Sequence, residues 1–135
     1  MHFMSVAITK GIKITVSTTF RPDLTQLNKQ LYFFNYSVKI ENLSTSRVQL
    51  LSRYWRIVDS LAPTRIVEGK GIIGEQPVLE PGESHVYTSG CDLSSELGYM
   101  EGYYNFVTIN DKGEQTKQFK VEVPRFHLEY QNKLN

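Results

Sequence analysis

The sequence predicts an all-β fold, an immunoglobulin-like or fibronectin type III-like β-sandwich of about seven antiparallel strands. Apolar and polar residues alternate in seven short segments, which is the pattern of strands with one buried face. Clusters of Asn, Asp, Ser and Gly lie between several of these segments and favour turns. The 8 Tyr, 7 Phe and 1 Trp residues stand among Val, Ile and Thr, which fit a pleated, half-buried surface. No window of about ten residues has clean helical periodicity.

The first three expected strands show the clearest patterns. In residues 12–17, Ile12, Ile14 and Val16 alternate with Lys, Thr and Ser. Residues 32–41 place aromatic and branched side chains on one face and polar side chains on the other. Residues 48–59 form a longer, mostly apolar run.

The last four expected strands are shorter or less regular. Residues 65–68 are few enough for an edge strand, and residues 86–88 follow a Pro-Gly turn. Residues 99–108 and 119–123 complete the series. Pro124 then either ends the last strand or forms a bulge in it, because proline cannot donate to a sheet.

Turns are expected at residues 42–46 and 110–113, where Asn, Asp, Ser and Gly bond back to the chain or take positive φ values. The best helical candidate is a single turn around residues 93–97, capped by Asp92 or Ser94. The first few residues and those after Glu129 are expected to be tails.

Length and charge indicate a single domain, residues 1–135, with a core over about residues 5–130. The 15 Lys and Arg residues nearly balance the 14 Asp and Glu residues, so the formal net charge is +1. Without a basic block, neither nucleic acid nor a membrane surface is an expected partner. No apolar run approaches the ~18 residues of a membrane span. No secretory signal is visible, so a cytoplasmic location is expected.

A literal G-x-G-x-x-G motif occupies residues 69–74 and opens a segment, residues 69–77, that we term the glycine loop. In a dinucleotide-binding fold such glycines let backbone amides approach a pyrophosphate at a helix N-terminus. Pro77 and Pro81 follow too closely for that helix, and the chain has no βαβ pattern. A looser alternative stays open, in which the loop amides and Lys70 bind a phosphate-bearing small molecule such as a nucleotide or pyrophosphate.

No catalytic or metal site is expected. The three His residues are far apart, and no zinc or calcium spacing is present. Cys91 is the single cysteine, which excludes an internal disulfide, and nothing near it predicts an activated thiol. Ser84-His85 lacks the glycine spacing of a nucleophile elbow. We therefore expect no enzymatic activity and no cofactor.

Residues 53–56 read Arg-Tyr-Trp-Arg. Strand alternation puts Arg53 beside Trp55 on one face, where residues of this kind often dominate protein interfaces. The competing interpretation, which we favour, makes Trp55 the core tryptophan of a sandwich strand. A tyrosine near residue 104 is expected to fix a corner between strands through its hydroxyl group.

The chain resembles the ApaG family from about residue 5 to residue 130. The resemblance is carried by the segments QLLSRYW (49–55), GKGIIGEQP (69–77), PGE (81–83) and YTSG (87–90), and by Gly98, Met100, Gly102, Tyr104, Asp111, Gly113, Phe119, Pro124, Phe126 and Leu128. Two positions depart from the family pattern. Ala62-Pro63 stands where a glycine turn is common, and Phe106 stands where Met is usual.

This resemblance implies a fibronectin type III-like sandwich and little enzymology. Bacterial members of the family are stand-alone cytoplasmic proteins, associated genetically with cobalt resistance and magnesium efflux and encoded near a dinucleoside-tetraphosphatase. Similar domains in eukaryotic F-box and polymerase-interacting proteins imply a role in protein contacts. A chain without a membrane span moves no ion itself, so any link to efflux is expected to be indirect.

The leading hypothesis is a non-enzymatic interaction module that binds a protein partner near the glycine loop, because a monomer has no need to expose the two isoleucines of that loop. The expected site consists of Gly69, Lys70, Gly71, Ile72, Ile73, Gly74, Glu75, Gln76, Arg53 and Trp55. Exposed edge strands also leave homodimerisation by sheet-edge pairing open.

Overall fold

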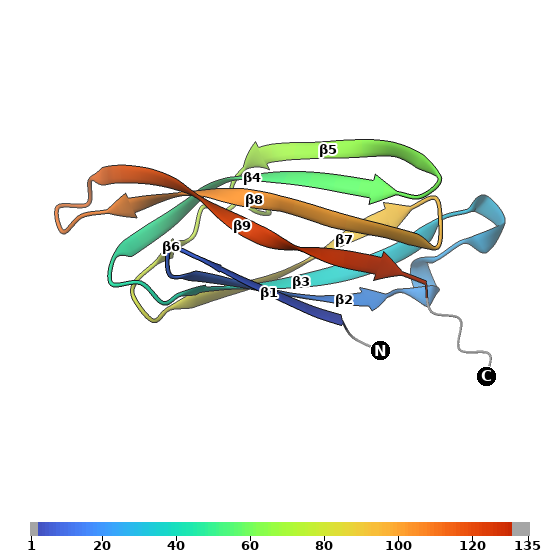
Figure 1. Ribbon diagram of the computed structural model, residues 1–135, viewed down its shortest axis with the longest axis horizontal. Coiled ribbons are helices and arrows are strands. Elements are labelled where there is room, and N and C mark those ends of the chain that lie inside the picture. Colours follow the sequence, from blue (N-terminus) through green and yellow to red (C-terminus); the bar gives the residue numbers. More distant parts are fainter. Residues whose placement is uncertain (1–2, 131–135) are drawn as a thin grey trace.

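The computed structural model describes residues 3–130, which form two antiparallel β-sheets packed as a sandwich (Figure 1). Two short 3₁₀ helices, η1 (Pro22–Leu24) and η2 (Leu27–Lys29), lie between the second and third strands. The strands are β1 (Phe3–Thr9), β2 (Ile12–Phe20), β3 (Tyr32–Asn42), β4 (Arg47–Asp59), β5 (Ala62–Lys70), β6 (Val78–Leu79), β7 (Ser84–Leu93), β8 (Leu97–Ile109) and β9 (Gln115–Glu129).

One sheet has the strand order β1-β2-β3-β7, and the other has the order β5-β4-β8-β9 with the short strand β6 paired to β4. The seven expected segments all fall within strands, namely β2, β3, β4, β5, β7, β8 and β9. Three strands facing four form the predicted seven-stranded sandwich, so the fold class is confirmed. β1 and β6 are additions to it.

Two local predictions are wrong and one alternative is settled. Residues 3 and 4 of the expected N-terminal tail belong instead to β1, because residues 3–9 pair with β2 across a two-residue turn. Residues 94–96 form a bend held by hydrogen bonds to the carboxylate of Asp59, and no helical turn. Pro124 lies within β9 at a register shift against β8, so it forms a bulge and does not end the strand. Residues 1–2 and 131–135 of the expected tails lie outside the described residues.

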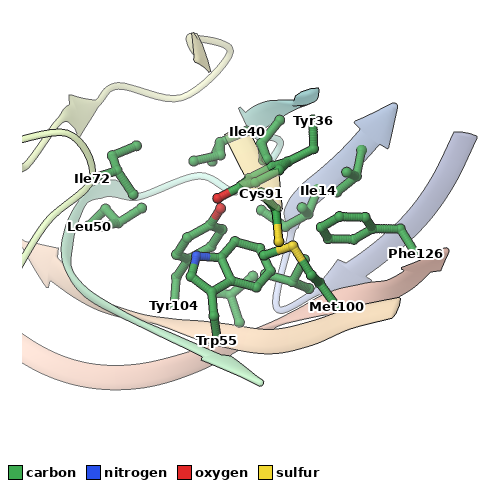
Figure 2. Close-up of a cluster of buried hydrophobic side chains, with 14 of the residues drawn as sticks. Ile14, Tyr36, Ile40, Leu50, Trp55, Ile72, Cys91, Met100, Tyr104 and Phe126 are labelled. Carbon is green, nitrogen blue, oxygen red and sulfur yellow. The ribbon is translucent and has the colours of Figure 1, made fainter. Parts of the chain in front are cut away.

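The core lies between the two sheets, and Trp55 is at its centre (Figure 2). Its side chain is 2% exposed. Its ring makes edge-to-face contacts with Tyr36, Tyr104 and Phe126, at centroid distances of 5.8, 5.9 and 5.8 Å. Such pairs stabilise a core beyond simple burial. The interpretation of Trp55 as a core residue is confirmed.

Tyr104 on β8 is fully buried, and its hydroxyl group lies within hydrogen-bonding contact of the hydroxyl of Tyr87 on β7. The expected structural role of a tyrosine hydroxyl near residue 104 is therefore present. It connects the two sheets across the core instead of fixing a corner.

The two long sides of the sandwich differ. On one side β1 lies against β9, where Thr9 Oγ1 accepts a hydrogen bond from the Glu122 N–H at 3.3 Å. On the other side the edge strands β5 and β7 are not paired. Arg65 of β5 spans that gap and donates to the backbone carbonyl of Asp92. A groove opens beside this contact.

Candidate functional site

The glycine loop runs along the edge of β4. Both β5 and β6 pair with that edge, and the loop fills the interval between them. β4 has a bulge between Leu50 and Ser52. The carbonyl of Leu51 in this bulge accepts the Gly71 N–H at 2.7 Å and the side-chain amide of Gln76 at 2.9 Å. The loop is thus fixed to a sheet edge.

The tip of the glycine loop is a two-residue turn at Ile73-Gly74. Ile72 and Glu75 exchange both backbone hydrogen bonds, at 2.8 and 2.9 Å. The φ values of +47° at Ile73 and +76° at Gly74 match a type I′ turn. A β-branched residue at positive φ is strained by about 1–2 kcal/mol. Ile73 is also 64% exposed, so the tip presents one strained apolar side chain to solvent.

Each glycine of the motif has its own structural reason. A Cβ atom on Gly69 would come within 2.9 Å of Arg53 Nη1, and one on Gly71 would come within 2.2 Å of the Glu75 carbonyl oxygen. Gly74 has open space around it and a positive φ, which glycine adopts without cost. Backbone geometry and an arginine contact therefore explain the motif.

The amides of the glycine loop are largely bonded within the protein. The N–H of Gly71 donates to Leu51, that of Ile72 to Glu75, and that of Glu75 to Ile72. Phosphate binding by a loop needs several such N–H groups directed at one anion. For the phosphate-binding alternative, the remaining groups of the loop are the Lys70 side chain and the backbone N–H groups of the turn at Ile73-Gly74.

The edge groove, a cavity of about 220 Å³, lies between the glycine loop and β7. Four predicted site residues line it together, namely Arg53, Trp55, Ile72 and Ile73. Ile73 and Arg53 are accessible, whereas Trp55 is a core residue. The expected exposure of Ile72 is wrong, because its side chain packs into the core and is 2% exposed. The remaining predicted residues do not line the groove: Gly69, Lys70, Gly71, Gly74, Glu75 and Gln76.

The opposite wall of the edge groove was not predicted. It is formed by Tyr87, Ser89 and Cys91 of β7 together with Tyr36 of β3. Alternation puts the three β7 residues on one face of a strand, and that signal is present in the sequence. Whether this face of β7 lies near Arg53 depends on the long-range pairing of β7 with β3. No local sequence pattern predicts that pairing.

Arg53 is the one arginine among residues 3–130 without a carboxylate oxygen within 4.0 Å. Five others form ion pairs at 2.6 to 3.4 Å: Arg21, Arg47, Arg56, Arg65 and Arg125. Arg53 instead donates to the carbonyl of Gly71 at 2.8 Å. A guanidinium group has five donors, so Arg53 can still bind an acidic group at the groove.

Burial keeps the cysteine and tyrosine side chains of the groove walls in their neutral forms. It raises the pKa of the Cys91 thiol to about 11, against the smaller opposing effect of Arg65, whose Nη2 lies 3.8 Å from Sγ. It also raises the pKa of Tyr36 and of Tyr87. Nucleophilic cysteines need the thiolate, which these surroundings disfavour at neutral pH.

Residues 3–130 contain no group of three or more His, Cys, Asp or Glu side chains placed to hold a metal ion. Within the same range there is no helix of the length and hydropathy needed to cross a membrane.

The fold and the site together define a fibronectin type III-like sandwich with a glycine loop along one sheet edge and a groove beside it. The sequence profile of the ApaG domain matches residues 22–108. The chain belongs to the ApaG family, as the resemblance implied.

The similarity to related proteins extends over almost the whole chain. The relatives named Protein ApaG from Methylobacterium radiotolerans and Brucella canis are 44% and 41% identical over 126 residues, and each match covers 93% of both chains. Among solved structures, the chain is similar to a crystal structure of an ApaA protein from Bordetella pertussis, with a TM-score of 0.80 and 35% identity. That match covers 87% of this chain and 92% of the other.

Proposed function

We propose that the chain is a non-enzymatic interaction module that binds a protein partner in the edge groove. The observation that carries the proposal is Arg53, which lines an apolar groove without a carboxylate partner among residues 3–130. Binding hot spots combine arginine with aromatic residues in a largely apolar pocket. The groove offers this combination with Arg53 beside Tyr87, and the buried rings of Trp55 and Tyr36 also line it.

Ile73 supports the same surface. Its side chain is 64% exposed and its backbone is strained, so folding alone gives no reason for isoleucine at the tip of the turn. An apolar contact with a partner supplies that reason. Val67 of β5 lines the same groove and is 38% exposed. The two side chains extend the apolar surface from the groove to the solvent.

Under this proposal the chain acts in the cytoplasm. Any effect on cobalt resistance or magnesium efflux would be an indirect result of partner binding. The alternative, binding of a nucleotide or pyrophosphate at the glycine loop, has less support because three loop amides are bonded internally. Calorimetric titration with ATP and with pyrophosphate separates the two functions. Heat of binding that disappears in Lys70→Glu would favour the alternative.

Affinity capture from cytoplasmic extract tests the main proposal with three immobilised chains: wild type, Ile73→Asp and Leu61→Asp. Leu61 is 71% exposed just before the far end of β5, so it is a matched control outside the groove. We expect wild type and Leu61→Asp to retain a protein that Ile73→Asp retains about tenfold less. In Ile73→Asp, a carboxylate would have to be buried against the apolar surface of the partner. Identical captured proteins on all three chains would contradict the proposal.

A further inference from the structure

β7 borders the edge groove and is the outermost strand of its sheet. It pairs with β3, and no other strand of residues 3–130 pairs with its outer edge. From Ser84 to Cys91 it contains no Pro, Lys, Arg, Asp or Glu. Natural sheets protect free edges with such residues. β5, across the groove, has four of them: Pro63, Arg65, Glu68 and Lys70. Of the two strands at the groove, β7 is therefore the one open to pairing.

The hydrogen bonds at one end of β7 determine which of its backbone groups face outward. Asn42 of β3 donates its N–H toward β7, to the carbonyl of Glu83 at 3.0 Å. The direction of these bonds alternates residue by residue in an antiparallel pair. With the observed register of β3 and β7, the N–H and C=O groups of Val86, Thr88 and Gly90 point to the free edge.

We propose that the partner is an extended peptide segment that pairs with β7 along residues 86–90 as an added strand. This inference rests on the proposed function and specifies the form of the partner. The open stretch ends at Asp92, because its carbonyl already accepts a hydrogen bond from Arg65. Side chains of an added strand alternate between two faces. Every second side chain of the peptide would therefore face the edge groove.

Arg53 specifies the chemistry of one of these side chains. Its guanidinium group donates to the Gly71 carbonyl at 2.8 Å and retains donors for a carboxylate. Charge-assisted hydrogen bonds of this kind are stronger than neutral ones. The added strand carries an Asp or Glu that faces Arg53, and an apolar residue on the same face that contacts Ile73.

A second copy of this chain fits the groove less well than a separate peptide. Two β7 strands from different copies could pair along their free edges. The single carboxylate of β7 is Asp92, which already forms an ion pair with Arg65 at 3.4 Å. Such a dimer would leave Arg53 without an acidic partner from β7.

Selection of random peptides displayed on phage against the full chain tests the proposal. The selected peptides are synthesised, and their affinities are measured for wild type, Thr88→Pro, Thr88→Val and Ile73→Asp. Proline removes the outward N–H of residue 88, which does not bond to β3, whereas valine retains it. We expect peptides with an acidic residue, at least tenfold weaker binding to Thr88→Pro, and unchanged binding to Thr88→Val.

Thermal melting first shows that all three variants fold. Selected peptides that lose affinity with Ile73→Asp but not with Thr88→Pro would overturn strand addition and leave the proposed function standing. Peptides whose affinity is unchanged by Ile73→Asp and by Thr88→Pro, or a selection that enriches no peptide, would overturn the inference. A wild-type dimer in sedimentation that Thr88→Pro dissociates would identify a second copy as the occupant and also overturn it.

Discussion

The guanidinium group of Arg53 lies against the backbone of Gly69, where a Cβ atom would come within 2.9 Å of Nη1. The same group donates to the carbonyl of Gly71 at 2.8 Å. Two glycines of the G-x-G-x-x-G motif thus hold an arginine side chain at the edge groove. The role of the motif in this fold is to position Arg53, because glycine leaves room for the long arginine side chain to lie flat on a sheet edge.

This geometry predicts unequal effects of alanine at the three glycines. Gly69→Ala displaces only the flexible end of Arg53, so we expect a cost of at most about 1 kcal/mol. Gly74→Ala has space but keeps φ near +76°, which costs about 1–2 kcal/mol. Gly71→Ala adds a contact of 2.2 Å with the Glu75 carbonyl and is expected to cost more than about 3 kcal/mol. Urea denaturation measures all three, and equal losses for Gly71→Ala and Gly74→Ala would contradict the loop geometry.

Relief of strain at Ile73 is expected to stabilise the protein. Asn tolerates positive φ far better than a β-branched residue, and an exposed isoleucine loses little burial. We expect Ile73→Asn to raise the free energy of unfolding by about 1 kcal/mol and the melting temperature by roughly 2–5 °C. Lys10 precedes Gly11 in an equivalent turn, with φ of +50°, but is unbranched. Calorimetry of Lys10→Asn is therefore the control. An equal increase in melting temperature there would show that the branched side chain of Ile73 is not the cause of the stabilisation.

The alternation in the sequence was sufficient to predict which faces of the central strands are buried. Ile12, Ile14 and Val16 are fully buried as expected, because a period of two fixes which side chains share a face. β1 was missed although Met4 and Ile8 belong to the same kind of pattern. Their side chains are 70% and 61% exposed, so the pattern there does not mark a buried face.

The edge groove was only half predictable. Ile73 was identified because it lies in a conspicuous glycine motif, and Arg53 because it lies in the Arg-Tyr-Trp-Arg segment of residues 53–56. The wall formed by Tyr87 and Cys91 depends on how β7 pairs with β3, and such long-range pairing leaves no local trace. The turn at Ile73 also contradicts the preference of β-branched residues for extended backbone, so local propensity predicts a different conformation there.

Asp59 is expected to govern part of the loss of stability in acid. Its side chain is buried, which alone would raise its pKa. Hydrogen bonds from the Ser95 hydroxyl at 2.6 Å, the Ser94 N–H at 2.6 Å and the Leu61 N–H at 3.1 Å together lower the pKa below its usual value. The resulting stabilisation is present above the unfolded-state pKa of about 3.9 and is lost as pH falls through the lower folded-state pKa.

Asp59→Asn is therefore expected to cost about 2–3 kcal/mol at pH 7, because an amide N–H₂ would face a donor. It is also expected to reduce the loss of stability between about pH 5 and pH 2. Urea denaturation across that pH range measures both effects. Asp111→Asn, in the exposed turn between β8 and β9, is the control for the loss of one carboxylate. Parallel curves for wild type and Asp59→Asn would contradict the assignment.

The hydroxyl groups of Tyr87 and Tyr104 are expected to act as a unit. They meet between the two sheets, and Tyr104 is fully buried. Burial raises the pKa of both phenols. Removal of one hydroxyl leaves the other buried without this partner, which costs about 1–3 kcal/mol, whereas removal of both can be nearly neutral.

A double-mutant cycle of Tyr87→Phe and Tyr104→Phe measures this coupling by urea denaturation. We expect the double variant to lose at least about 1 kcal/mol less than the sum of the two single losses. Because folding raises the phenol pKa values, their stabilising contribution is complete below about pH 10 and is lost as pH rises further. The double variant is therefore expected to lose less stability above pH 10 than wild type. Additive single losses together with an unchanged alkaline curve would show that the two hydroxyl groups act independently.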